Sequence, residues 1–185
     1  MVSDLIERLA LGLEASDIPY MLIGGQAVAV HGEARFTRDI DVTLGVGPER
    51  LTELLDLVKD LQLEVQVESP KDFVGRTMVL PCHDPASGMG VDFVFLHSVY
   101  ERQAIDRAHV VPLGKASVRF VSVEDLVIHK IVAGRPRDLE DVRNVLLKNP
   151  EFDRSYVEKW LRDFTRDLGE PYSQRFAGVL KALPK

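Results

Sequence analysis

Residues 20–44 read YMLIGGQAVAVHGEARFTRDIDVTL, and this stretch decides the fold. An apolar run, Tyr20–Ile23, ends at Gly24-Gly25, which is typical of a buried strand that enters a tight turn. Residues 26–31 are small and compatible with a helix. Residues 39–44, Asp-Ile-Asp-Val-Thr-Leu, alternate strictly, so the acids share one face of a strand and the aliphatic side chains the other. The order strand, turn, helix, strand is therefore predicted.

Around this stretch the periodicity predicts a mixed α/β (α+β) core followed by a helical tail. Strands are expected at residues 61–67, 73–80, 91–96 and 116–121, a loop at 81–90, and helices at 3–15, after Pro48 and at 100–108. From Ser122, which with Asp125 forms a capping-box signature, the rest of the chain reads as helices. We expect a core over residues 1–121, with a short, mixed, mostly antiparallel sheet, and a C-terminal helical subdomain over 122–185. The active site is expected in the cleft between them.

Composition narrows the class of protein. The 185 residues are 45% hydrophobic and 28% charged, which suits a folded domain. The net charge of −6 disfavours non-specific nucleic-acid binding, although a local basic groove stays compatible with it. The single cysteine, Cys82, cannot form an internal disulfide and favours a reducing compartment. No apolar run approaches a membrane span or a signal-peptide core, so a soluble, cytoplasmic protein is expected.

Three carboxylates form the candidate site for chemistry. Asp39 and Asp41 lie two residues apart on one strand, about 6.5–7 Å along the backbone, with both side chains on one face. Like charges held this close repel one another unless a cation neutralises them, and Mg²⁺ prefers carboxylate oxygens. Asp92 interrupts the apolar run Val91–Leu96, where a carboxylate is costly unless it is paired or metal-bound. If the two strands are neighbours, the three acids can form a phosphoryl-transfer site.

A purely structural interpretation competes with this one. An Asp-x-Asp strand is often only half exposed to solvent, and Asp92 could pair with an arginine. The glycines favour the functional interpretation, because a strand that ends in Gly24-Gly25 before a helix gathers backbone N–H groups and a helix N-terminus at one point, where phosphate binds well.

Two motifs resemble a known family. Leu22-Ile23-Gly24-Gly25, followed after thirteen residues by Asp39-Ile40-Asp41-Val42, resembles the signature of the polymerase-beta-like nucleotidyltransferase superfamily. The string GGQAVAVHGEARFTRDIDV is more specifically similar to AbiEii/AbiGii-toxin-type nucleotidyltransferases. Residues 124–142, EDLVIHKIVAGRPRDLEDV, resemble a second element of that group, a helix with a lysine followed by Arg-x-Arg/Lys-Asp and a further acid. The resemblance covers most of residues 20–145.

The resemblance implies a role for each matching residue. Gly24 and Gly25 would hold the triphosphate of a nucleoside triphosphate. Asp39 and Asp41 would ligate Mg²⁺ or Mn²⁺, and Asp92 would complete the metal site and help to activate the attacking hydroxyl. Gly25 stands where many relatives have serine, so a hydroxyl contact to phosphate is missing and backbone amides must serve alone.

Supporting residues have alternatives as well. Lys130 shares the apolar face of its helix, so its ammonium could bind the triphosphate, or its stem could simply cover the core. Thr37 could reach the nucleotide from the loop before the acid pair, as could Arg35. Asp138 and Asp141, three residues apart, suit a structural ion-pair network with Arg135 and Arg137.

The expected activity is transfer of a nucleoside monophosphate from the triphosphate to a hydroxyl, with release of pyrophosphate. The acceptor could be a small molecule, an RNA end or a protein side chain, and the toxin-like resemblance makes an antitoxin partner an expectation too. The alternatives are a nucleotide-binding or interaction module without turnover, and a plain α/β domain whose carboxylates form ion pairs.

Overall fold

The computed structural model describes residues 1–184. Its helices, in chain order, are α1 (Val2–Ala15), α2 (Gly24–His31), the 3₁₀ turn η1 (Pro48–Arg50), α3 (Leu51–Asp60), α4 (Pro70–Thr77), α5 (Val99–Asp106), α6 (Val123–Ala133), α7 (Pro136–Lys148), α8 (Arg154–Leu168) and α9 (Tyr172–Lys181). Its strands are β1 (Tyr20–Ile23), β2 (Asp39–Leu44), β3 (Glu64–Val65), β4 (Val79–Asp84), β5 (Met89–Val94), β6 (His109–Leu113) and β7 (Ala116–Phe120).

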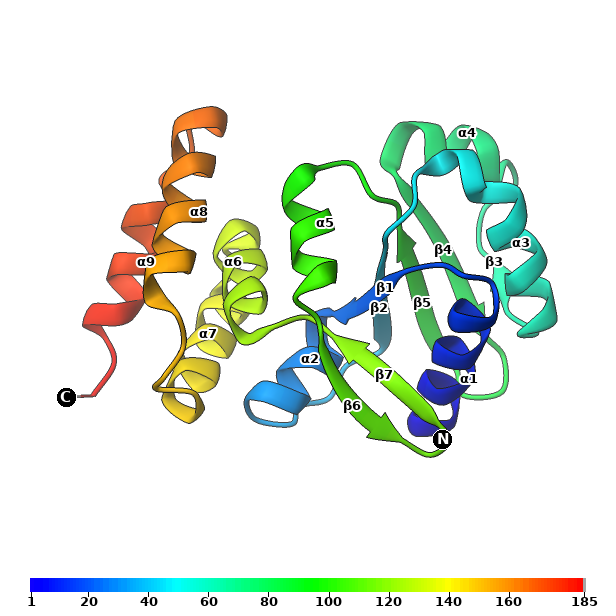
Figure 1. Cartoon of the computed structure of the whole chain (residues 1–185), viewed down its shortest axis with the longest axis horizontal. Helices are drawn as coiled ribbons and strands as arrows, with labels where there is room; N and C mark the ends of the chain where they lie inside the picture. Colours follow the sequence, from blue (N-terminus) through cyan, green and yellow to red (C-terminus); the bar gives the residue numbers. More distant parts are fainter. Residues whose placement is uncertain (185) are drawn as a thin grey trace. The chain divides into compact units, whose positions relative to one another are not determined.

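The strands form one mixed sheet in the order β3-β4-β5-β2-β1-β7-β6 (Figure 1). The pairs β2–β5 and β1–β7 are parallel, and the other neighbours are antiparallel. The predicted α/β class with a mixed, mostly antiparallel sheet is therefore confirmed. The sheet brings β2 and β5, which are far apart in the chain, into direct contact at its centre.

Two expectations for the segment between α3 and β5 were wrong. Residues 73–80, expected as a strand, belong mostly to α4, because Pro70 occupies its first turn, where a missing N–H costs nothing, and the Ser69 hydroxyl bonds the Asp72 carboxylate at 2.7 Å. Residues 81–90, expected as a loop, mostly continue β4 and begin β5. Their extended conformation comes from cross-strand pairing, which local composition does not reveal.

Strand β6 was missed altogether. It contains Pro112, which cannot donate a ladder hydrogen bond, and the structure accommodates it at the edge of the sheet, beside β7.

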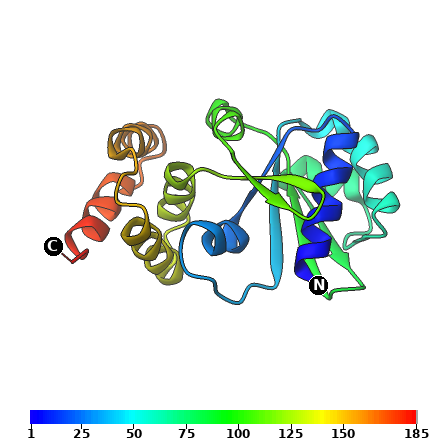
Figure 2. The same cartoon turned by 60° about the horizontal axis from the view of Figure 1, so that its bottom comes forward.

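Helices α1 and α3 both contribute to the apolar core of unit 1. Leu5, Leu9 and Leu13 recur along one side of α1 and are buried. Helices α1 and α3 lie side by side (Figures 1 and 2). At Gly12 of α1, an added Cβ would lie 2.8 Å from a methyl group of Leu57 in α3. A larger side chain at that position would push the helices apart.

By its internal contacts the chain divides into two units. Unit 1, residues 1–26 and 36–121, contains the whole sheet. Unit 2, residues 27–35 and 122–185, contains the end of α2 and the four C-terminal helices. Residues 27–35 thus group with helices that are about a hundred positions later in the sequence.

Unit 2 is a bundle of α6 to α9, visible in Figure 2 as the yellow-green to red helices. The predicted start of α6 is confirmed, because the Ser122 hydroxyl accepts a hydrogen bond from the Asp125 N–H at 3.1 Å. Gly134 ends this helix in the left-handed conformation. The segment 27–35 is fastened to the bundle by Asn149, whose amide donates to the His31 carbonyl at 2.7 Å.

A buried ion network holds unit 2 together. The Lys130 ammonium lies 2.8 Å from Asp138 and 2.9 Å from Asp141, and all three side chains are buried. Arg35 donates two hydrogen bonds to Asp141, both at 2.9 Å, and Arg135 reaches Asp138 at 2.6 Å. Each buried carboxylate therefore has cationic partners, which burial of a charge requires.

No helix within residues 1–184 combines the length and the apolar character that crossing a membrane requires.

Candidate active site

The strand register brings the predicted acids together. In the parallel pair β2–β5, Asp41 lies opposite Asp92 and Asp39 lies opposite Gly90. Because registered partners and alternate residues share a face, the three carboxylates lie on the same side of the sheet. Asp39 is exposed, and Asp41 and Asp92 are half-buried.

The glycine turn lies directly beneath one of these acids. Gly24 follows β1 with φ of +65°, a left-handed conformation that other residues adopt only with strain. A Cβ on Gly24 would overlap the carboxylate of Asp41. The position therefore requires glycine twice over, for its backbone angle and for the room that it leaves for Asp41.

Gly25 makes room for a different group. A Cβ there would lie 2.7 Å from the hydroxyl oxygen of Thr37, so any side chain at position 25 would displace Thr37. Thr37 in turn donates to the Asp39 carbonyl at 3.3 Å, which ties the loop to the start of β2. The threonine hydroxyl occupies the space that a side chain at position 25 would fill.

Sequence reasoning missed Gly90, which it assigned to a loop. A Cβ on this residue would lie 2.5 Å from a carboxylate oxygen of Asp39. Gly90 is thus the third glycine that leaves space for a side chain of the candidate site. The signal was the pattern Gly-x-Asp at residues 90–92, which places the glycine and the acid on one face of a strand.

The negative charges of the three acids lie close enough to affect one another. Burial raises the pKa of Asp92, and the negative charges of Asp41 and then Asp39 raise it further. The field of Asp92 also reaches the opposite face of β4, where burial and this charge raise the pKa of the Cys82 thiol to about 12. The repulsion among Asp39, Asp41 and Asp92 favours binding of a cation or a proton at these acids.

The donor set suits a hard divalent cation, since carboxylate oxygens are the protein ligands that Mg²⁺ prefers. Within residues 1–184, no group of three or more His, Cys, Asp or Glu side chains is already arranged to hold a metal ion. A Mg²⁺ site needs no such cage, because this ion usually binds through one or two carboxylates together with substrate phosphates and water.

Two further candidates lie in unit 2. The Lys130 ammonium is paired with Asp138 and Asp141, and Arg35 is bonded to Asp141. The ion-pair network expected for Asp138 and Asp141 is present, and Lys130 and Arg35 are part of it. Contact of either residue with a triphosphate stays a prediction.

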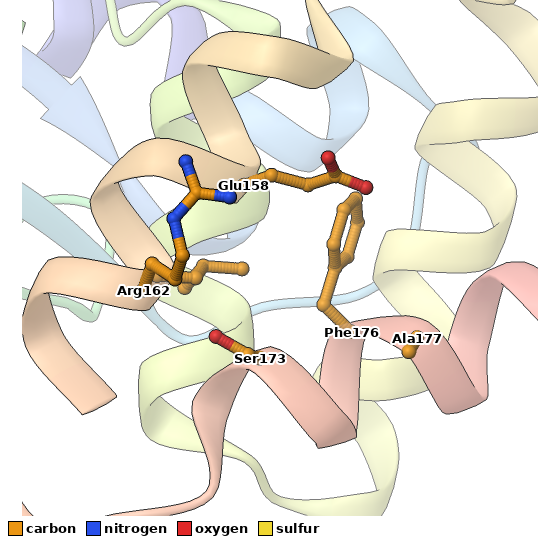
Figure 3. Close-up of a pocket in the computed structure, with 6 residues that line it drawn as sticks. Glu158, Arg162, Ser173, Phe176 and Ala177 are labelled. Atoms are coloured by element: carbon orange, nitrogen blue, oxygen red, sulfur yellow. The ribbon is translucent and has the colours of Figure 1, made fainter. Parts of the chain in front are cut away.

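Unit 2 also contains a groove of about 190 Å³ between α8 and α9 (Figure 3). Leu161, Phe176 and Ala177 supply apolar surface, and Glu158, Arg162 and Ser173 supply polar groups. This lining offers one carboxylate and one cation, so it lacks the cluster of acids that distinguishes the face carrying Asp92.

Comparison with known proteins identifies a family of nucleotidyltransferases. The model of a family described as "Nucleotidyltransferase of unknown function (DUF6036)" matches residues 2–175. No curated protein matches the sequence significantly.

Among solved structures, ANT(2″)-Ia in complex with adenylyl-2″-tobramycin shares the fold with a TM-score of 0.61 and 19% sequence identity, over 91% of this chain and 98% of that one. An antigenic nucleotidyltransferase-like protein from Paracoccidioides brasiliensis gives 0.57 and 18%, over 99% and 93%. The lincosamide antibiotic adenylyltransferase LnuA, lincomycin-bound, gives 0.50 and 15%, over 72% and 89%. Because fewer than one residue in five is identical, these similarities describe the fold alone.

The glycine beneath Asp41 can be tested with a matched pair of variants. Gly24→Ala and Gly88→Ala both place alanine at a left-handed position, but a Cβ on Gly88 meets nothing within 4 Å. Both variants should lose about 1–2 kcal/mol of stability through backbone strain. Only Gly24→Ala should also displace Asp41 and weaken binding of Mg²⁺ with ATP, by at least about tenfold, in thermal-shift titrations. Equal affinities in the two variants would show that the space above Gly24 is irrelevant to the site.

The raised pKa of Asp92 predicts how stability depends on pH. Because its folded-state pKa lies above the unfolded value, ionised Asp92 destabilises the metal-free protein, and this cost disappears as pH falls through that pKa. Asp92→Asn should therefore raise Tm at pH 7 without metal, by at most roughly 2–4 °C since solvent screens a half-exposed pair.

The difference in Tm between Asp92→Asn and the parent protein should shrink towards pH 4, whereas Asp56→Asn, at an exposed site on α3, should change Tm little at either pH. A lower Tm for Asp92→Asn at pH 7 would contradict the repulsion.

Proposed function

The chain belongs to the DUF6036 family of nucleotidyltransferases, and from this membership we propose that it moves a nucleoside monophosphate from a nucleoside triphosphate to a hydroxyl of a small molecule, assisted by Mg²⁺ or Mn²⁺. One observation carries the proposal: Asp41 lies beside Asp92 on the neighbouring strand and directly above the Gly24 turn. This arrangement suits simultaneous contact with the phosphates and with the attacking hydroxyl.

The phosphate end of the site would be the turn between β1 and α2. The first N–H groups of a helix have no partner within the helix, and its N-terminus carries partial positive charge. Gly24 and Gly25 begin α2 and add no side chains of their own at this helix end, where the Asp41 carboxylate and the Thr37 hydroxyl lie instead. The Thr37 hydroxyl fills the space at Gly25 and donates to the Asp39 carbonyl at 3.3 Å. By turning this proton from the carbonyl to a phosphate oxygen, it would supply the contact that glycine cannot.

Asp39, Asp41 and Asp92 would hold the metal together with the phosphates. When bound, the metal neutralises the triphosphate and lowers the pKa of the acceptor hydroxyl. The carboxylates themselves would position the ion. Burial raises the pKa of Asp92 and the charges of Asp41 and Asp39 raise it further, and a cation would relieve this repulsion.

Asp92 would also accept the proton of the acceptor, because its half-buried carboxylate lies beside Asp41, next to where the metal would hold the acceptor. The acceptor oxygen forms a bond to the α-phosphorus while the bond from that phosphorus to the β-phosphate oxygen breaks. Pyrophosphate leaves with the electron pair, and Asp92 takes the hydroxyl proton.

We favour a small molecule over an RNA end or a protein side chain. The site is acidic and the chain carries a net charge of −6, which disfavours a polyanion. Structures of the same fold were solved with adenylyl-2″-tobramycin and with lincomycin, which are small molecules. A toxin role, an antitoxin partner and a cytoplasmic location stay predictions from sequence.

Pyrophosphate release measured with each of the four nucleoside triphosphates, Mg²⁺ and a panel of hydroxyl compounds tests the activity. Asp39→Ala and Asp41→Asn should each lower the rate by on the order of 10²-fold or more, while Asp56→Asn on α3 should leave it unchanged. Nucleotide binding without pyrophosphate release, whatever the acceptor, would favour a module without turnover. Absence of any Mg²⁺-dependent thermal shift with nucleotide would favour a purely structural domain.

The role of Thr37 has its own test. Thr37→Val keeps the shape of the side chain but removes the hydroxyl, so the KM for the nucleotide should rise about 10- to 100-fold, as expected for loss of a hydrogen bond to a charged group. Thr37→Ser retains the hydroxyl and should restore most of the affinity. If valine and serine behave alike, the hydroxyl does not contact phosphate.

A further inference from the structure

The acidic face of the sheet continues beyond Asp92 onto β4 and β3. In the antiparallel pair β4–β5, His83 lies opposite Gly90, and in β3–β4, Glu64 lies opposite His83. Registered partners share a face, so one row crosses the sheet as Asp39, Gly90, His83 and Glu64. The imidazole Nδ1 of His83 is 4.0 Å from a carboxylate oxygen of Glu64, as expected for side chains on the same side.

Gly90 contributes no side chain to this row between Asp39 and His83. An Asp39 carboxylate oxygen lies 2.5 Å from where a Cβ of Gly90 would be, so Asp39 extends towards β4 over this glycine. Two strand spacings separate Asp39 from His83, about 9–10 Å between backbones. In the adjacent row, Pro81 lies opposite Asp92 and adds no ionisable group.

His83 and Glu64 are available to a ligand. The side chain of His83 is 38% exposed and that of Glu64 is 64% exposed, and their mutual contact is long for an ion pair. A contact of this kind is worth little to stability, so its exchange for contacts with a ligand costs little.

The geometry of phosphoryl transfer indicates that His83 and Glu64 lie on the side from which the acceptor approaches. Attacking and leaving oxygens lie roughly in line with the transferred phosphorus. If the leaving pyrophosphate is held at the Gly24 turn after β1, the acceptor approaches from the opposite direction. The strand order β4-β5-β2-β1 places that direction over β5 and then β4.

We propose that His83 and Glu64 form an acceptor subsite that selects hydroxyl compounds carrying an amino group. The inference rests on the proposed function, because it takes the position of the acceptor from that reaction. Metal would offset the charges of Asp39 and Asp92, whereas the Glu64 carboxylate is left to attract an ammonium group and to repel anions. The His83 imidazole would orient a hydroxyl by hydrogen bonding.

Binding of defined probes to the whole chain, in the presence of Mg²⁺ and a non-hydrolysable ATP analogue, tests the subsite. Glucosamine and glucose form a matched pair that differs by the amine, tobramycin is a polyamine with several hydroxyls, and a short RNA is the polyanionic comparison. We expect glucosamine and tobramycin to bind more tightly than glucose and RNA, and to shift the His83 side-chain NMR signals, which are assigned by their loss in His83→Gln.

Glu64→Gln and His83→Gln should each weaken tobramycin binding by about 3- to 10-fold without changing affinity for the ATP analogue, and Asp56→Asn should change neither. Unchanged tobramycin binding in both variants, no binding of either amine by the parent protein, or preferential binding of RNA would overturn the subsite while nucleotide binding persists. Loss of nucleotide binding in the parent protein itself would instead remove the proposed function, and the subsite with it.

Discussion

The repulsion between Asp41 and Asp92 at the centre of the sheet is the constraint on which the rest of the site depends. The parallel pairing of β2 with β5 places the two carboxylates side by side, and burial together with this repulsion raises the pKa of Asp92. A sheet built only for stability would avoid like charges opposite one another. The apolar side chains of these two strands, such as Ile40, Val42, Val91 and Phe93, are fully buried and favour the pairing. A cation bound at the two acids would relieve their repulsion.

Unit 2 shows how the same chain treats acids that serve structure. Burial alone would raise the pKa of Asp138, but hydrogen bonds from Arg135 and Lys130 outweigh it and lower the pKa. Asp141 is likewise bonded to Arg35 and Lys130. The acids of this network have cationic partners within the bundle, whereas an acid whose pKa is raised, such as Asp92, is a candidate for a functional site. This contrast separates two groups of aspartates that look alike in the sequence.

Much of the fold could be predicted because local patterns decide it. The alternation of residues 39–44 predicted β2 with its acids on one face, and Ser122 and Gly134 predicted both ends of α6. One failure was local, since Pro70 and the Ser69–Asp72 contact make residues 70–77 a helix where a strand was expected. The other failures depended on pairing across distance, as in β4, whose extended form comes from its neighbours. The grouping of residues 27–35 with unit 2 likewise follows from contacts such as that of Asn149 with the His31 carbonyl. The register that sets Asp39 over Gly90 is also a property of the folded sheet.

Three glycines connect the sequence pattern with the folded site. At each of them, a side chain from another segment occupies the space that a Cβ would need. The side chain is that of Asp41 at Gly24, of Thr37 at Gly25 and of Asp39 at Gly90. In the sequence, Gly25 in place of serine reads as a missing hydroxyl, yet the folded chain fills that space with the hydroxyl of Thr37. A functional group is defined by where its atoms lie and not by which residue carries them. The position of the Thr37 hydroxyl beside Gly25 is therefore the basis of the phosphate contact proposed for Thr37.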